Sequence, residues 1–249
     1  MDGTTAVPMA RFVAPIVWRR LGLLSKIALK VAHDCLDPQH KVRMVFASRH
    51  GELKRTTSIL CGMGAVEPEP VSPTAFSLSV LNAMSGISGI ARKDRSATCA
   101  LSAGEETLGY GLLEAFAQYE EDKTSPVLFV YADEPVDAMF HAAEDETAGR
   151  ALALLIGGTG GETMGRLVCA TQECADEGRL ANGNETDETR AEKADMKPHH
   201  VFASQHAAVL TCLTTHSPAA WRARRIEAQT QTGAQAGVIW QWSWHDGAA

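Results

Sequence analysis

The chain has 249 residues, of which 45% are hydrophobic and 21% charged, and its formal net charge is −7. Such values are ordinary for a globular protein with a sizeable core. The acidic balance argues against a nucleic-acid partner held by a basic face, and no apolar run reaches the roughly 20 uncharged residues that a membrane span needs.

The first ninety residues predict alternating helices and strands. Ser25 is expected to cap a helix that runs to about Leu36, and residues 41–51 are expected to form a strand that ends in a turn at Gly51. A helix over residues 52–63 should stop at the nearby glycines, and three prolines make residues 65–73 a loop. The apolar, small-residue stretch over 74–91 predicts one further helix.

Residues 96–116, SATCALSAGEETLGYGLLEAF, predict a short strand, a tight turn and a helix. Turns of this kind frequently place an enzyme's nucleophile at the tip. Here the tip is Ala103, Gly104 and Glu105, and none of them is a nucleophile for acyl transfer. Ser102 would need a general base positioned against it, and a thiol inside the strand, at Cys99, would be buried and inert.

The second half predicts further strands. Residues 126–133 are almost purely apolar, so they predict a central strand buried on both faces, and residues 149–158 and 165–173 predict two more. A helix is expected over 201–215. A last strand over 237–246 carries tryptophans 240, 242 and 244 on one face, which we interpret as an edge strand covering a core rather than a ligand platform. Strands alternating with helices predict an α/β layered fold with a mostly parallel sheet.

Residues 173–195 hold eight acids and three bases and no large aromatic residue, which predicts a solvated, mobile loop. The six cysteines form no CxxC pair, so we expect free thiols in a reducing cytosol. Neither these cysteines nor the histidines at 199, 200, 206 and 216 have the spacing of a metal site. The glycines over 157–161 lack the lysine of a phosphate-binding loop. We therefore expect no metal and no cofactor.

The order of these segments resembles the N-terminal half of the β-ketoacyl synthases. The matching stretches are MVFASRHGELKRTTSIL, the N-x-x-x-G core at Asn82 and Gly86, the strand and elbow over 96–116, PVLFVYADEPV and AGRALALLI. The stretches SPTAFSLSVLNA, AGEETLGYGLLEA and VYADEPV, with a closing W-x-W strand, are similar to the chain-length-factor proteins of aryl polyene pathways.

This resemblance implies a thiolase-like layered α/β fold with a complete N-terminal half and an abbreviated C-terminal half. It implies a single domain over residues 1–249, with a ketosynthase-like half over 1–160, an acidic mobile loop over 173–197 and an abbreviated helix and strand over 198–249. Synthases carry a cysteine at the elbow, and spacing from Asn82 and Gly86 puts it within 103–105, where this chain has none. The two histidine motifs of the synthases are also missing, and His206 is a faint echo of one.

The resemblance thus implies a vestigial elbow at Ala103, Gly104 and Glu105 in a cytoplasmic, non-catalytic subunit. Such a subunit would pair with a catalytic β-ketoacyl synthase, meet the acyl carrier protein and its chain through that partner, and set chain length by shaping the acyl tunnel. We expect the interface strand to be Ala97, Thr98, Cys99, Ala100 and Leu101. We expect the tunnel-facing residues to include Phe76, Leu78, Val80 and Leu81.

Two other functions stay open. One is a stand-alone acyl transferase or hydrolase that uses Ser102 or Cys99. The other is a structural scaffold of a biosynthetic complex, with no influence on the product. Glu105 is either a remnant with a polar role towards the partner or an acid favoured in the first turn of a helix.

Overall fold

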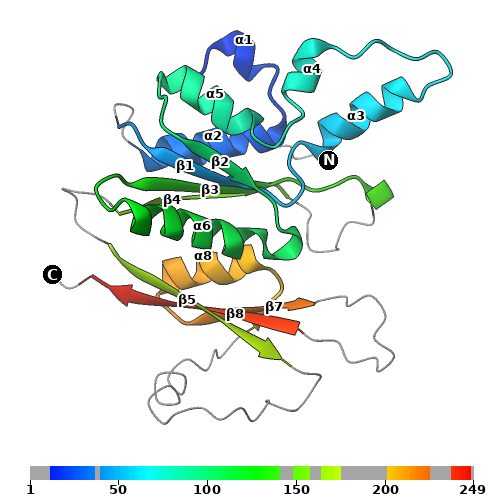
Figure 1. The fold of residues 1–249 in the computed structure, drawn as a ribbon. Helices are drawn as coiled ribbons and strands as arrows, with labels where there is room; N and C mark the ends of the chain where they lie inside the picture. The colour runs from blue at the N-terminus through cyan, green and yellow to red at the C-terminus, as the bar shows by residue number, and fades with distance from the viewer. Residues whose placement is uncertain are drawn as a thin grey trace. The chain divides into compact units, whose positions relative to one another are not determined.

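The computed structural model describes residues 12–36, 40–140, 148–157, 164–174, 201–224 and 237–247. These residues form two compact units, Met1–Gly160 and Gly161–Ala249. Each unit has its own four-stranded sheet (Figure 1). Much of the acidic segment expected to be a mobile loop lies outside the described residues.

The sheet of the first unit, sheet A, has the strand order β2-β1-β3-β4. Strand β1 pairs in parallel with both β2 and β3, while β3 and β4 are antiparallel. All seven residues of β3 are buried, as the apolar run over 126–133 predicted. The bounds of the strands are Arg43–Ala47 for β1, Thr98–Leu101 for β2, Val127–Asp133 for β3 and Arg150–Ile156 for β4.

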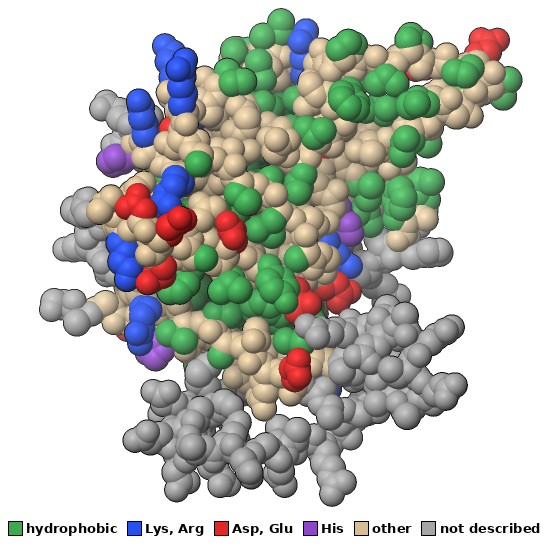
Figure 2. Space-filling model, viewed as in Figure 1, with side chains coloured by type: hydrophobic (Ala, Val, Ile, Leu, Met, Phe, Trp, Pro, Cys, Tyr) green, Lys and Arg blue, Asp and Glu red, His purple; other side chains and the backbone are tan. Residues whose placement is uncertain are grey.

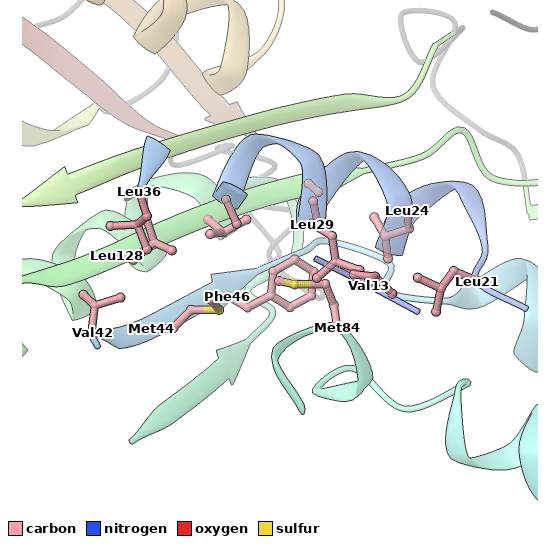
Figure 3. Close-up of a cluster of buried hydrophobic side chains, with 14 of the residues drawn as sticks. Val13, Leu21, Leu24, Leu29, Leu36, Val42, Met44, Phe46, Met84 and Leu128 are labelled. Atoms are coloured by element: carbon pink, nitrogen blue, oxygen red, sulfur yellow. The ribbon is translucent and has the colours of Figure 1, made fainter. Parts of the chain in front are cut away.

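Helices cover both faces of sheet A. Helices α2 and α5 lie on one side and α6 on the other (Figure 1). Phe46 and Leu128 point towards α2 and join the main hydrophobic cluster, which also takes in Leu29 and Met84 (Figure 3). Because side chains alternate along a strand, their sequence neighbours face α6. The bounds are Pro15–Trp18 for α1, Leu23–Cys35 for α2, Leu53–Met63 for α3, Pro73–Ser77 for α4, Ala83–Arg92 for α5 and Thr107–Glu121 for α6.

Helix α6 lies unusually close to the sheet at Gly111. A Cβ added at Gly111 would lie 2.7 Å from the Cβ of Ala47 and 2.7 Å from Cε2 of Phe129. Real Cβ atoms do not approach other atoms so closely, so only glycine allows this packing distance. At the far end of the helix, the Arg43 guanidinium donates to the carbonyl oxygens of Gln118, Asp122 and Ser125 at 2.7–2.8 Å.

The expected cap of α2 is wrong. Ser25 lies inside the helix, which begins after Gly22 without a side-chain cap of its own. The Ser25 hydroxyl instead donates to the buried carboxylate of Glu52 at 2.5 Å. A Cβ on Gly22 would lie 2.5 Å from Oε2 of Glu52. The carboxylate therefore sits at the positive end of α2, where an anion is favourable.

The single helix predicted over 74–91 is also wrong, because the segment forms two helices, α4 and α5, with a turn between them. The helix ending at Gly64 and the proline-rich loop are confirmed. Helix α3 has no buried residue. With α4 it forms an arm that carries several exposed hydrophobic side chains, at Leu60, Met63, Val66, Val71 and Phe76.

The second unit contains a mixed sheet, sheet B, in the order β5-β8-β7-β6. Its pairs are antiparallel except β6 with β7, so the mostly parallel pattern holds for sheet A alone. The tryptophan strand β8 lies between β5 and β7 and is not an edge, while Trp240 and Trp242 stack at 6.1 Å. The bounds are Gly165–Cys174 for β5, Val201–Phe202 for β6, Gln205–Thr215 for helix α8, Ala219–Arg224 for β7 and Gly237–Asp246 for β8.

Two elements of the second unit differ from the prediction made from the sequence. Strand β7, with the sequence AAWRAR, was not predicted. The helix expected over 201–215 begins only at Gln205, where the Ser204 hydroxyl accepts from the N–H of Ala207 at 3.2 Å. None of the helices in the described ranges is long and apolar enough to cross a membrane.

Replacing glycine by alanine should have opposite effects on the stability of the first unit at Gly111 and at Gly86. Gly111→Ala should lower the free energy of unfolding by about 1–3 kcal/mol, because the new methyl group overpacks the contact with Ala47 and Phe129. Gly86→Ala, whose Cβ meets nothing within 4 Å in helix α5, should raise it by about 0.5–1 kcal/mol. Urea unfolding of the two variants checks both signs. A neutral Gly111→Ala would contradict the packing described for α6.

Candidate functional site

Polar residues gather where the parallel strands of sheet A end. Strands β1, β2 and β3 run in the same direction, so their carboxyl ends meet at one edge of the sheet. Ser48 follows β1, Ser102 follows β2, and Asp133 ends β3. In open α/β sheets this is the edge at which ligands bind.

Asp133 organises the turn that leaves β1. Its Oδ1 accepts hydrogen bonds from the Ser48 hydroxyl at 2.8 Å, from the Arg49 N–H at 2.8 Å and from the His50 N–H at 3.4 Å. The Ser48 hydroxyl in turn accepts from the N–H of Gly51 at 3.0 Å, where φ is +57°. Burial raises the pKa of Asp133 above its ordinary value, although these hydrogen bonds oppose the shift. Oδ1 of Asp133 is thus a structural acceptor that holds the turn.

The elbow after β2 is closed on itself. The N–H of Ala103 donates to the Thr107 hydroxyl at 2.9 Å, and that hydroxyl donates to the carbonyl oxygen of Gly104 at 2.6 Å. Gly104 has φ of +59° and opens the short 3₁₀ turn η1, Gly104–Glu106, that leads into α6. The amide at the tip is therefore already bonded within the elbow.

Neither candidate nucleophile beside the elbow is activated. The Ser102 hydroxyl donates to the carbonyl oxygen of Arg49 at 2.8 Å. Its proton therefore points at a neutral carbonyl oxygen, which cannot act as a general base. Burial raises the pKa of the Cys99 thiol, and the negative charge of Glu114 raises it further. A thiol of raised pKa stays protonated and is a poor nucleophile near neutral pH.

Glu105 faces Arg49 across the elbow. The guanidinium Nη2 lies 3.5 Å from Oε1 of Glu105, in an ion pair that is largely exposed. An exposed pair of this kind contributes little to stability. It does link the turn after β1 with the elbow after β2, so the two loops at this edge are joined by charge as well as by the Ser102 hydrogen bond.

A pocket of about 280 Å³ opens beside this edge, lined in part by Gly22, Glu52, Lys54, Arg55 and Glu134. The side chain of Glu134 is 5% exposed, and its closest cation is the Lys54 Nζ at 3.8 Å. Burial raises the pKa of Glu134 above its ordinary value; the positive charges of Lys54 and Arg55 oppose this shift, and the negative charges of Glu52 and Asp133 add to it. In the described ranges no group of three or more His, Cys, Asp or Glu side chains could hold a metal ion.

The structure separates the four residues expected to face a tunnel. Phe76 and Val80 are 61% and 41% exposed. Leu78 and Leu81 are partly buried and pack against the main hydrophobic cluster of the same chain. The expected interface strand begins at Thr98 rather than Ala97 and forms one edge of sheet A. His199 and His200 lie outside the described residues, and His206 lies in the first turn of α8.

A family model of the β-ketoacyl synthase N-terminal domain matches residues 2–242. The chain belongs to the β-ketoacyl synthase family. No curated protein matches it.

Three solved structures share this β-ketoacyl synthase fold at low identity. A ketosynthase, ApeO, in complex with its chain length factor, ApeC, from Xenorhabdus doucetiae is 22% identical, with a TM-score of 0.66 over 98% of this chain and 86% of that chain. The ishigamide ketosynthase/chain length factor is 15% identical, with a TM-score of 0.58 over 91% and 82%. A β-ketoacyl synthase from Burkholderia phymatum STM815 is 9% identical, with a TM-score of 0.55 over 98% and 86%. The α/β thiolase-like layered fold predicted from the sequence is confirmed.

Sequence reasoning found the elbow but missed the network behind it. The bond from Ser48 to Asp133 joins residues 85 positions apart, and the pocket brings Gly22 together with Glu134. One signal was available, since Asp133 ends a strand that is otherwise almost purely apolar and a second acid, Glu134, directly follows it. Charged residues in that position are seldom left without a structural or functional role.

Replacing Glu134 should change the pH dependence of stability. Because the folded pKa of Glu134 is raised, the unfolded chain loses its proton first as the pH rises, and the free energy of unfolding falls through that interval. Glu134→Gln removes this loss. The free energy of unfolding of the variant should therefore exceed that of the parent protein at pH 8, and the two should differ little below pH 4. Urea unfolding at both pH values measures it.

Glu120→Gln is the matched control, because that carboxylate is largely exposed and forms an ion pair with Lys123 at 3.0 Å. It should leave the pH dependence unchanged. If the free energy of unfolding depended on pH in the same way for Glu134→Gln and the parent protein, the pKa of Glu134 would not be raised in the folded state.

Proposed function

We propose that this chain is the non-catalytic chain-length-factor subunit of a heterodimeric ketosynthase. It pairs with a catalytic β-ketoacyl synthase and shapes that partner's acyl tunnel, in the elongation of aryl polyene or polyketide-type chains bound to an acyl carrier protein. The function needs no cofactor of its own, since packing and shape alone decide how deep a tunnel is.

One observation carries the proposal: the elbow keeps its shape and lacks a nucleophile. Gly104 holds the positive φ of a tight turn, and Ala103 and Glu105 flank it. Two hydroxyls lie beside the tip, those of Ser102 and Thr107, and each donates to a backbone carbonyl oxygen. A condensing enzyme needs a nucleophile and an oxyanion donor at this point, and here the Ala103 N–H is engaged by Thr107.

The free edge of β2 supports a permanent partner. The carbonyl oxygens of Ala97 and Leu101 accept from β1, at 3.1 and 3.2 Å. Backbone groups alternate in direction along a strand, so those of Thr98 and Ala100 point to the open side. An apolar edge without lysine, proline or a bulge invites pairing with another strand, and a ketosynthase strand is the occupant that we propose.

Apolar side chains flank this edge. Along one side of α6, Tyr110, Leu113 and Phe116 are 39%, 55% and 52% exposed. Figure 2 shows hydrophobic side chains at the surface over α6 and over the arm of α3 and α4. Helix α6 packs on β1 and β3, and β1 is the strand that pairs with the edge strand β2. Obligate interfaces are apolar and exceed about 2,000 Å², which fits a surface of this composition.

The exposed residues of α4 and the turn after it are the ones that we assign to the tunnel. Phe76 and Val80 project from the chain, while Leu78 and Leu81 hold the segment on the core. The Leu81 Cδ1 atom lies 3.1 Å from the position of a Cβ on Gly51, so this segment also packs on the turn after β1. The tunnel-facing pair is thereby supported from behind by packed side chains.

The comparisons add support for a partner of this kind. Two of the similar structures are described as a ketosynthase with a chain length factor. The cytoplasm is the compartment that we propose, since the five cysteines with described side chains are free thiols, and a reducing compartment maintains that state.

Proline on the open side of β2 should abolish pairing. Thr98→Pro and Ala100→Pro each remove an N–H that faces the partner, while the bonds from β2 to β1 stay intact. Co-purification with a co-expressed ketosynthase should be lost, and condensation measured with acyl carrier protein and a malonyl donor should fall with it. The isolated chain should have no condensing activity.

Thr98→Ala is the control, because it changes the side chain and keeps the N–H group. Turnover by the isolated chain that Ser102→Ala or Cys99→Ala abolishes would favour the stand-alone enzyme. If both proline variants still co-purified with the ketosynthase, the interface would lie elsewhere on the chain.

Truncating the tunnel-facing residues should lengthen the product. Phe76→Ala removes a ring that is 61% exposed in this chain, so the fold should tolerate it while the partner's tunnel deepens. Leu81→Ala truncates a partly buried residue that packs on the core, so it should mainly cost stability, near the lower end of the roughly 2–5 kcal/mol range for a core leucine. Mass spectrometry of the chains made by the assembled complex gives their lengths.

Val66→Ala is the matched truncation, since Val66 is fully exposed in the loop of the arm. It should leave product length unchanged. Unchanged length in every variant that still assembles would favour the scaffold function over chain-length control.

A further inference from the structure

The pocket of about 280 Å³ in the first unit is lined by a buried carboxylate that lacks a hydrogen bond. The side chain of Glu134 is 5% exposed, and no group in the described ranges donates a hydrogen bond to it. Its ion pair with the Lys54 Nζ spans 3.8 Å, beyond the roughly 2.7–3.2 Å of a hydrogen bond. Buried carboxylates usually accept hydrogen bonds, because the loss of water is otherwise uncompensated. The acceptor capacity of Glu134 is therefore left for a group that enters the pocket.

The other acid of the pocket, Glu52, is already bound within the chain. Its Oε1 accepts from the Ser25 hydroxyl at 2.5 Å, and its Oε2 lies 3.8 Å from the Nε of Arg55. The Arg55 guanidinium is itself held by a hydrogen bond to the carbonyl oxygen of Arg20 at 2.8 Å. Glu52 thus has a donor and a cation fixed beside it, whereas Glu134 has neither at hydrogen-bond distance.

Lys54 compensates Glu134 weakly. The Lys54 side chain is 53% exposed, so its ammonium group is largely solvated. An ion pair with one partner in solvent and no hydrogen bond contributes little to stability. A cation that brings N–H donors into the pocket can therefore displace Lys54 from Glu134.

The size and the remaining walls of the pocket limit what can enter it. Drug-sized ligands occupy sites of about 300–1,000 Å³, so this pocket has room for a group the size of one long side chain. Leu23, Ile59 and Ala75 supply apolar walls, which suit an aliphatic stem. The two carboxylates disfavour an anion, and a hard divalent cation would need about six oxygen ligands.

We propose that this pocket binds a guanidinium group on a short aliphatic stem, with the Glu134 carboxylate as its acceptor. The planar fork of a guanidinium can donate two parallel hydrogen bonds to one carboxylate. It is also less strongly hydrated than an ammonium group, so it enters a buried site more readily. The group can come from a small free guanidine or from an arginine side chain of a bound protein. The proposal stands apart from the control of chain length, because the residues that carry it all lie in this chain.

The probe is n-butylguanidinium, titrated into the full chain at low salt by isothermal calorimetry, with uncharged n-butylurea as the matched ligand of the same shape. The chain should bind the guanidinium and not the urea. Glu134→Gln keeps the size of the side chain and removes its charge, so it should weaken guanidinium binding about tenfold or more. Glu120→Gln, which removes a largely exposed carboxylate, should leave the affinity within about twofold.

Lys54→Met separates binding at Glu134 from a merely structural role of the ion pair. It keeps an unbranched side chain and removes the competing cation, so guanidinium binding should become about twofold to fivefold tighter. Weaker binding in Lys54→Met would indicate an anionic ligand and overturn the proposal. Equal affinity of the parent protein and Glu134→Gln, or equal affinity for n-butylguanidinium and n-butylurea, would overturn it as well.

The source of the guanidinium is found by repeating the titration on the full chain in complex with a ketosynthase. Loss of n-butylguanidinium binding in the complex, with weaker co-purification of Glu134→Gln, would assign the pocket to an arginine side chain of the ketosynthase. Unchanged affinity in the complex would assign it to a free guanidine. If the proposed function fails and no complex forms, the titrations of the full chain alone still decide whether the pocket binds a guanidinium.

Discussion

The first unit depends on one constraint, the burial of β3 on both faces. Its side chains alternate between the cluster under α2 and the contact with α6, so neither helix can move without exposing the strand. Gly111 allows α6 to pack closely on this face of the sheet, because any side chain at that position would clash with Ala47 and Phe129. The position of α6 along β3 is thereby fixed, and with it the point at which the elbow enters the helix.

That fixed position explains how the elbow keeps its shape with no nucleophilic side chain at its tip. The turn is stabilised by Thr107, whose hydroxyl bonds to both sides of the tip, and by the bond from Ser102 to the turn after β1. These contacts satisfy backbone groups that a tight turn would otherwise leave unpaired. None of these contacts involves a nucleophile, so the turn is stable with Ala103, Gly104 and Glu105 at its tip. The same contacts occupy the amide that an oxyanion would need.

Local patterns in the sequence predicted what local physics decides. The run over β3 gave a buried strand because apolar β-branched residues continue without a polar break, and Gly51 and Gly64 marked real turns. The cap of α2 could not be read, because its anion comes from Glu52, 27 positions beyond Ser25. Strand β7 was missed because alanine and arginine carry little β-propensity, and its neighbours in the sheet supply the stabilisation. At the site, the sequence alone shows that the tip of the elbow has no nucleophilic side chain. Which of the four residues are exposed, Phe76 and Val80, and which are partly buried, Leu78 and Leu81, depends on tertiary packing.

The two ends of sheet A are suited to different kinds of contact. At the carboxyl edge two acids have partners within the chain: Asp133 accepts hydrogen bonds from the turn, and Glu105 forms an ion pair with Arg49. At the amino edge the acid Asp94 is turned inward and three cations, Lys41, Lys93 and Arg95, are left outside. An apolar strand edge lies between them, and strand pairing is short-ranged and demands exact register. Charge contacts are longer-ranged and tolerate several orientations. In the proposed heterodimer the lasting contact is therefore the one made through the backbone groups of β2, because its register fixes the position of the partner.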